Sequence, residues 1–99
     1  MVAEFVKDGT TLTVKPDGRL DTATSPELER LMKPELKGMT EVIVDLEKVD
    51  YISSGGLRVL LSAEQEMEER DGSMKVIHAN PYIMEIFGIT GFLDLLTVE

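Results

Sequence analysis

One stretch near the middle of the chain decides the fold: Val49-Asp50-Tyr51-Ile52-Ser53-Ser54-Gly55-Gly56-Leu57-Arg58-Val59-Leu60-Leu61. The apolar run over residues 42–46 just before it predicts a buried strand, and a short acidic connection follows that strand. Two serines and two glycines then precede apolar residues at helical spacing. The sequence therefore predicts a strand, a loop and a helix, with Ser53 and Ser54 at or near the helix N-terminus.

Serines at the start of a helix can serve in two ways. A serine side chain can cap the free backbone N–H groups of the first turn, and the glycines can simply ease a tight turn. Alternatively, the partial positive charge of the helix end favours a phosphate placed on the hydroxyl. Because Gly55 and Gly56 lack side chains, another protein could then approach the serines closely. The local pattern leaves both interpretations open.

Length and composition predict one small globular domain over residues 1–99. The chain has 42% hydrophobic residues, no cysteine, no apolar run of the roughly 20 residues that span a bilayer, and no signal-peptide pattern. We therefore expect a cytoplasmic protein without disulfides or thiolate metal sites. Nineteen acidic residues against ten basic ones give a net charge of −9, which disfavours direct binding to nucleic acid or to an anionic membrane.

The first half of the chain is expected to form a hairpin and a helix. Asp8-Gly9 suits a hairpin turn between strands at residues 2–7 and 10–16, with Thr10 assignable either to the loop or to the second strand, and a polar connection over residues 18–24 follows. Ser25 is the expected N-cap of the helix, with Pro26 at its first position. Pro34 should kink or stop this helix near residue 33. Its apolar face comprises Leu28, Leu31, Met32 and Leu36.

The second half continues the alternation of strands and helices. A strand is expected at residues 74–78, a helix beginning at Asn80-Pro81, and a last short strand at residues 95–98. The predicted order is β-β-α-β-α-β-α-β, which is an α/β fold with a mixed sheet of about five strands.

Residues that could support catalysis are scarce. His78 is the single imidazole, and nothing in the sequence brings it to Ser54 as a general base. Nucleotide-binding glycine loops, the Gly-x-Ser-x-Gly elbow and the spacing of a metal site are absent from the sequence. We therefore predict an interaction module, not an enzyme, without a cofactor or metal.

Three segments together resemble a known family. Gly18-Arg19-Leu20-Asp21, the apolar strand at residues 42–46 and the stretch over residues 51–60 look like the STAS domain, and more narrowly like the bacterial anti-sigma-factor antagonists. The late segment over residues 88–92 also fits. The resemblance covers nearly the whole chain in order. It implies a STAS-type sheet with the helices packed mainly on one face.

The resemblance also implies a function based on partner exchange. Antagonists of this family bind an anti-sigma factor that is also a serine kinase, and thereby release a sigma factor for transcription. The kinase phosphorylates the antagonist, the complex separates, and a metal-dependent serine phosphatase restores the unmodified form.

Site residues follow from the family motif, which is commonly Asp-Ser-Ser/Thr-Gly-Leu. Aligned on Gly56-Leu57, the motif places the phosphorylated serine at Ser54, with Ser53 in the aspartate position and as a rival acceptor. The implied partner-contact surface comprises Asp21, Thr22, Ser53, Gly55, Gly56 and Arg58. The alternative is a STAS-type scaffold, or a regulatory subunit of a transport system, in which the serine is not phosphorylated.

Overall fold

A β-hairpin forms one edge of the sheet in the computed structural model, which describes residues 2–99. Strands β1 (Val2–Asp8) and β2 (Thr11–Leu20) are antiparallel, and Asp8 pairs with Thr11. The two-residue connection is therefore Gly9-Thr10, with Gly9 at a φ of 63°. The prediction of an Asp8-Gly9 turn was wrong by one residue, because Asp8 still belongs to the ladder.

Strand β2 is long enough to pair with two parallel strands in succession. Its first half pairs with β3 (Glu41–Asp45), and its last residues pair with β4 (Val49–Ile52) after a register shift at Gly18. The φ of 102° at Gly18 is a conformation that suits glycine. The prediction that the strand ends at residue 16 and that residues 18–24 form a polar connection was therefore wrong in part: the strand continues through Gly18 to Leu20, and only residues 21–24 connect it to the helix that follows.

The fold class is confirmed, with two corrections to the order of elements. The sheet has five strands in the order β1-β2-β3-β5, with β4 beside β2 and β5 at Ser73–Ile77. Strand β4 was not predicted from the sequence. Residues 95–98, predicted as the last strand, contribute only a single bridge between Val98 and Val76, after the short 3-10 helix η2 (Phe92–Asp94).

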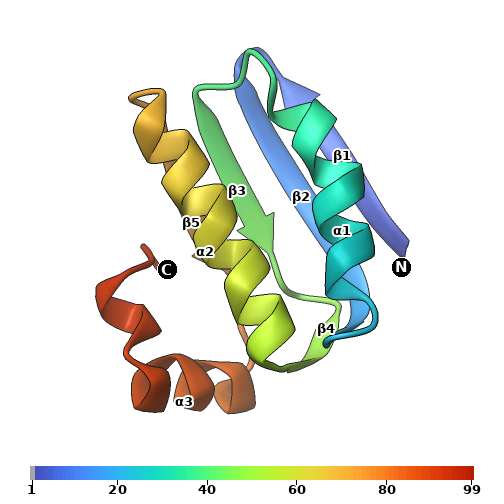
Figure 1. Ribbon diagram of the computed structural model, residues 1–99, viewed down its shortest axis with the longest axis vertical. Coiled ribbons are helices and arrows are strands. Elements are labelled where there is room, and N and C mark those ends of the chain that lie inside the picture. The colour runs from blue at the N-terminus through green and yellow to red at the C-terminus, as the bar shows by residue number, and fades with distance from the viewer. Residues whose placement is uncertain (1) are drawn as a thin grey trace.

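Two helices lie side by side across one face of the sheet, and a third lies near its β4 end (Figure 1). The pair are α1 (Ser25–Met32) and α2 (Ser54–Glu69). Helix α1 passes into the 3-10 helix η1 (Lys33–Leu36), as Pro34 predicts. The third helix is α3 (Pro81–Thr90), in which the predicted cap is confirmed: the Asn80 side chain accepts a bond from the Ile83 N–H at 2.7 Å.

The predicted N-cap of α1 is displaced by one residue. Thr24 is the N-cap and Ser25 is the first helical residue. The cause is a local network, in which the Asp21 carboxylate accepts the Thr24 N–H at 3.0 Å and the Asp21 main-chain oxygen accepts the Ser25 N–H at 2.9 Å. Asp21 therefore organises the start of this helix.

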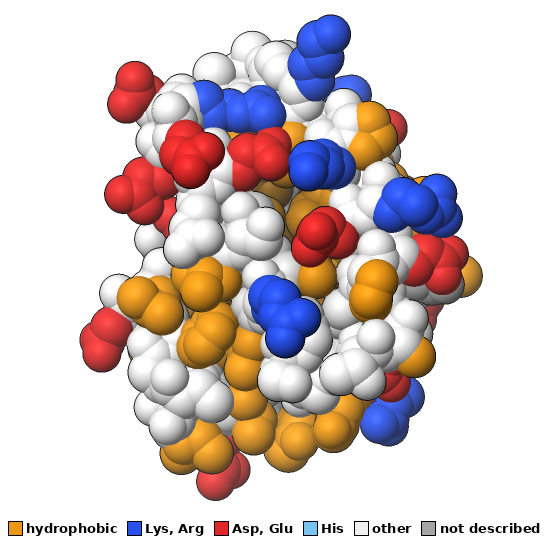
Figure 2. All heavy atoms as spheres, viewed as in Figure 1, with side chains coloured by type: hydrophobic (Ala, Val, Ile, Leu, Met, Phe, Trp, Pro, Cys, Tyr) orange, Lys and Arg blue, Asp and Glu red, His pale blue; other side chains and the backbone are white. Residues whose placement is uncertain are grey.

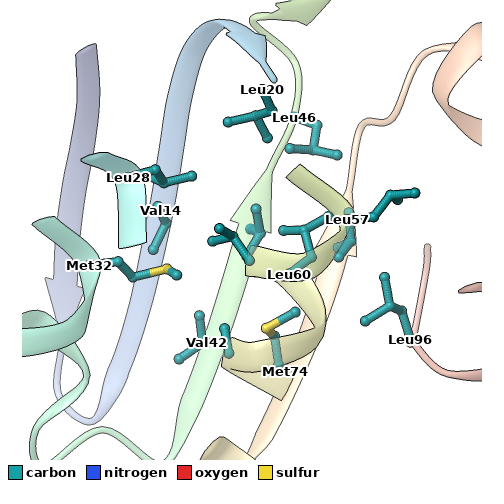
Figure 3. Close-up of a cluster of buried hydrophobic side chains, with 14 of the residues drawn as sticks. Val14, Leu20, Leu28, Met32, Val42, Leu46, Leu57, Leu60, Met74 and Leu96 are labelled. Carbon is teal, nitrogen blue, oxygen red and sulfur yellow. The ribbon is translucent and has the colours of Figure 1, made fainter. Parts of the chain in front are cut away.

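The core fills the space between the sheet and the helix pair (Figure 3). Alternate strand residues point into it, among them Val14, Val42 and Met74, and they meet Leu28 of α1 and Leu60 of α2. The first residue of α2 therefore lies at the end of the domain where β4 and α3 lie (Figure 1).

Candidate functional site

The two serines differ sharply in accessibility. Ser54 is the first residue of α2 and is exposed, whereas Ser53 is the extended N-cap residue before it. The Ser53 Oγ is buried and has no hydrogen-bond partner within residues 2–99, and its N–H donates to the Leu20 oxygen at 2.9 Å. Ser53 therefore faces its own domain, and Ser54 presents its hydroxyl to solvent.

Gly55 and Gly56 are buried against strand β2 and the loop after it. A Cβ at Gly56 would lie 2.7 Å from Ile52 Cγ1 and 2.8 Å from the Leu20 oxygen. A Cβ at Gly55 would lie 3.1 Å from the Asp21 oxygen. The close approach that these glycines permit is thus between α2 and its own domain, which differs from both interpretations left open by the sequence, a tight turn or the approach of another protein.

Asp21 and Thr22 form the loop against which the start of α2 packs. The Asp21 carboxylate accepts the N–H groups of Thr24 and Ala23, each at 3.0 Å, and lies 3.5 Å from Arg19 Nε. These bonds, with the one from the Thr24 N–H foremost, lower the pKa of Asp21. Asp21 is therefore an ionised side chain that is already engaged within the loop.

A groove of about 320 Å³ separates the first turns of α1 and α2. Thr22, Gly55 and Arg58 line it, together with Ser25, Pro26, Glu29 and Val59. The structure thus brings together the residues expected from the resemblance: Asp21, Thr22, Ser53, Ser54, Gly55, Gly56 and Arg58 lie around the start of α2. Only Thr22, Ser54 and Arg58 of this set are exposed.

A stack of three side chains beside this site was missed by the sequence analysis. The Arg19 guanidinium carbon lies 4.1 Å above the Tyr51 ring, and the Tyr51 and Tyr82 rings stack with centroids 6.0 Å apart. Arg19 and Tyr51 stand in the segments that carry the resemblance, but Tyr82 lies 31 positions later in the sequence. Only the packing of α3 against β4 reveals the stack.

Apolar side chains are also exposed at this end of the domain. Most charged side chains lie over the upper half of the face in Figure 2, whereas apolar ones gather over the lower half, where α3 and the start of α2 lie. The exposed apolar side chains include Ile89, near the C-terminal end of α3 and 74% exposed, and Leu95, just after η2 and 53% exposed. Such a mixture of exposed apolar groups, tyrosine and arginine is typical of protein–protein contact surfaces.

His78, the candidate base for a hydrolase, is engaged elsewhere. Its Nδ1 lies 2.9 Å from an Asp45 carboxylate oxygen, and no hydrogen bond joins it to either serine within residues 2–99. The same residues contain no group of three or more His, Cys, Asp or Glu side chains placed to hold a metal ion. Nor does any described helix have the length and apolar character needed to cross a membrane.

Comparison with known proteins gives consistent results. The STAS domain pattern matches residues 3–99. The anti-sigma-B factor antagonist of Staphylococcus aureus is 34% identical over 87 residues, which are 87% of this chain and 81% of that protein. BtrV of Bordetella bronchiseptica, provisionally named as an anti-sigma factor antagonist, is 34% identical over 82 residues, which are 82% of this chain and 71% of BtrV.

Solved structures resemble the fold at lower sequence identity. The anti-sigma factor antagonist SpoIIAA, a Bacillus protein, matches in its unphosphorylated form with a TM-score of 0.77 and 15% identity, over 99% of this chain and 87% of that one. Its phosphorylated form matches with a TM-score of 0.76 and 16% identity, over 99% of this chain and 91% of that one.

Proposed function

The chain belongs to the STAS domain family, and from that premise we propose that it is an anti-sigma factor antagonist controlled by phosphorylation of Ser54. In this proposal the unmodified protein binds an anti-sigma factor that is also a serine kinase, and a sigma factor is released. The names of the relatives in Staphylococcus aureus and Bordetella bronchiseptica support the antagonist function. The two forms of SpoIIAA motivate the switch.

One observation carries the choice of acceptor: Ser54 is exposed, whereas the Ser53 Oγ is buried. A kinase must reach the hydroxyl from solvent, so the exposed serine is the acceptor. The kinase transfers the γ-phosphoryl group of ATP to the Ser54 Oγ, with release of ADP and the hydroxyl proton. The metal-dependent phosphatase later adds water across the P–O bond, which restores the serine and releases inorganic phosphate.

The position of Ser54 also explains why its modification would act on binding and not on folding. A phosphoserine adds about −1.5 to −2 charge at pH 7. At the first position of a helix this charge meets the positive end of the helix dipole, so the domain itself tolerates it. At a protein–protein contact the same charge must be desolvated, which opposes association.

Mass spectrometry tests the proposal directly. The protein is incubated with ATP and a lysate of its source organism, in parallel with Ser54→Ala and Ser53→Ala. We expect one added phosphate of about 80 Da on the wild type and on Ser53→Ala, and none on Ser54→Ala. Loss of the phosphate only in Ser53→Ala would move the site to the buried serine. If a control substrate shows active kinases, complete absence of phosphate would favour an unphosphorylated STAS module.

A further inference from the structure

Arg58 lies one helical turn after Ser54 on the outward side of α2. Both residues are exposed, and residues four apart on a helix have neighbouring side chains. No ion pair engages Arg58 within residues 2–99, whereas Arg19 and Arg70 each contact a carboxylate. Arg58 is thus an available cation beside the proposed acceptor.

The surroundings of Arg58 contain further unused polar groups. No side chain caps the first turn of α2, so its N–H groups are not satisfied by a cap. Ser25 lines the groove beside Arg58, is 1% exposed, and its Oγ has no hydrogen-bond partner within residues 2–99. A polar group buried without a partner is costly, and it favours a polar ligand in this groove.

Two acidic residues near Arg58 could compete for it. Glu29 lines the same groove, but no salt bridge joins it to Arg58 within the described residues. The Asp21 carboxylate already accepts bonds from Ala23 and Thr24. A dianionic phosphate on Ser54 carries more charge than either carboxylate and stands on the same helix as Arg58.

We propose that Arg58 pairs with the phosphate on Ser54 and holds it against the start of α2. This inference rests on the proposed function for the presence of that phosphate. As a consequence, phosphorylation would change the contact surface in two ways. It adds negative charge at Ser54, and it withdraws the Arg58 guanidinium from any partner that contacts this arginine.

Titration of the phosphate by phosphorus NMR tests the pairing without a kinase. Phosphoserine is incorporated at position 54 during synthesis of the protein, in wild-type, Arg58→Gln, Arg58→Lys and Arg30→Gln backgrounds. Arg30→Gln removes an exposed arginine of α1 that does not line the groove, so it controls for net charge. A neighbouring cation favours the dianion, so Arg58→Gln should raise the titration midpoint by about half a pH unit. The titration midpoints of Arg58→Lys and Arg30→Gln should stay near that of the wild type.

Equal midpoints for the wild type and Arg58→Gln would overturn the inference, and so would an equal shift in Arg30→Gln. The pairing and the proposed function can fail separately. If Arg58→Gln raises the titration midpoint as expected but no kinase phosphorylates Ser54, the pairing would stand and the proposed switch would be refuted. If a kinase phosphorylates Ser54 but Arg58→Gln leaves the titration midpoint unchanged, the proposed switch would stand and the pairing would be refuted.

Discussion

Glu64 is an unpaired carboxylate in the middle of α2. Its Oε2 is buried and has no hydrogen-bond partner within residues 2–99. Burial raises the pKa of Glu64, and the nearby Glu68 charge adds to that effect. The folded state therefore holds the Glu64 proton more tightly than the unfolded chain does. Its contribution to stability is complete below the unfolded pKa and is lost as the pH rises through the raised folded pKa.

The substitution Glu64→Gln should therefore stabilise the protein at neutral pH. Glutamine keeps the shape of the side chain but carries no charge to bury, so we expect a gain of up to about 1 kcal/mol at pH 7. The gain should vanish at acidic pH, where Glu64 is protonated in both states. Urea unfolding at several pH values measures it, with the exposed Glu85→Gln as the charge-matched control. A gain that persists unchanged at acidic pH would contradict this account.

For Ser53 and Ser54, the sequence predicts the position in the fold but not the exposure of each side chain. The positions of Ser53 and Ser54 at a helix start were predictable, because the glycines and the apolar spacing that follow them are local signals. Their difference in exposure was not, because the N–H of Ser53 is bonded to Leu20, more than thirty residues earlier in the chain. The neighbouring Arg19–Tyr51–Tyr82 stack was hidden for the same reason.

At the scale of elements, the contact between α2 and β2 depends on Gly56. A methyl group there would meet the Leu20 main-chain oxygen and Ile52 at 2.8 and 2.7 Å, and a backbone atom cannot move aside without shifting the strand. We expect Gly56→Ala to lower the free energy of unfolding by about 2–3 kcal/mol, as overpacking does. Urea unfolding measures the loss.

Gly88 provides the matched control for this prediction. It lies within α3, and a Cβ there would meet only Leu93 Cδ1 at 3.9 Å. Gly88→Ala should therefore stabilise the protein by about 0.5–1 kcal/mol, through the better helix propensity of alanine. If both substitutions changed stability equally, the close approach of α2 to β2 would not explain the glycine at position 56.

Strand β4 shows why the order of elements was only partly predictable. Residues 41–45 and 49–52 follow one another closely, and both pair with β2 in parallel because β2 bends at Gly18. In the sequence, β4 looks like part of a loop because it is short, follows directly after β3, and pairs with residues of β2 that lie about thirty positions earlier. The helices were easier to predict, because their caps, prolines and apolar spacing are all local.

Over the molecule as a whole, most charged side chains are separated from the exposed apolar ones on the face in Figure 2. The net charge is −9, yet the face in Figure 2 carries most of its charged side chains away from the start of α2. Tyr82, which stacks on Tyr51 of β4, is exposed at the end of the domain that holds Ser54. A charge added at Ser54 has Arg58 as a neighbour on the helix, but in a protein–protein contact it would still have to be desolvated, which opposes binding.

This desolvation cost predicts that Ser54→Asp affects binding and leaves the fold intact. An acidic residue in the first turn of a helix is favourable, so the free energy of unfolding should change by less than about 1 kcal/mol. Affinity for the proposed partner, an anti-sigma factor with kinase activity, should fall at least tenfold, which is about 1.4 kcal/mol. Calorimetry with the purified partner, together with thermal unfolding, measures both quantities.

Ser62→Asp is the matched control, since it adds the same charge two turns further along α2 at another exposed serine. It should leave affinity within about threefold of the wild type, because exposed charges farther from the contact are screened by salt and solvent. Equal losses in both variants would attribute the effect to net charge alone. Unchanged affinity in Ser54→Asp, with the fold preserved, would show that the start of α2 lies outside the contact, and the proposed switch would then fail.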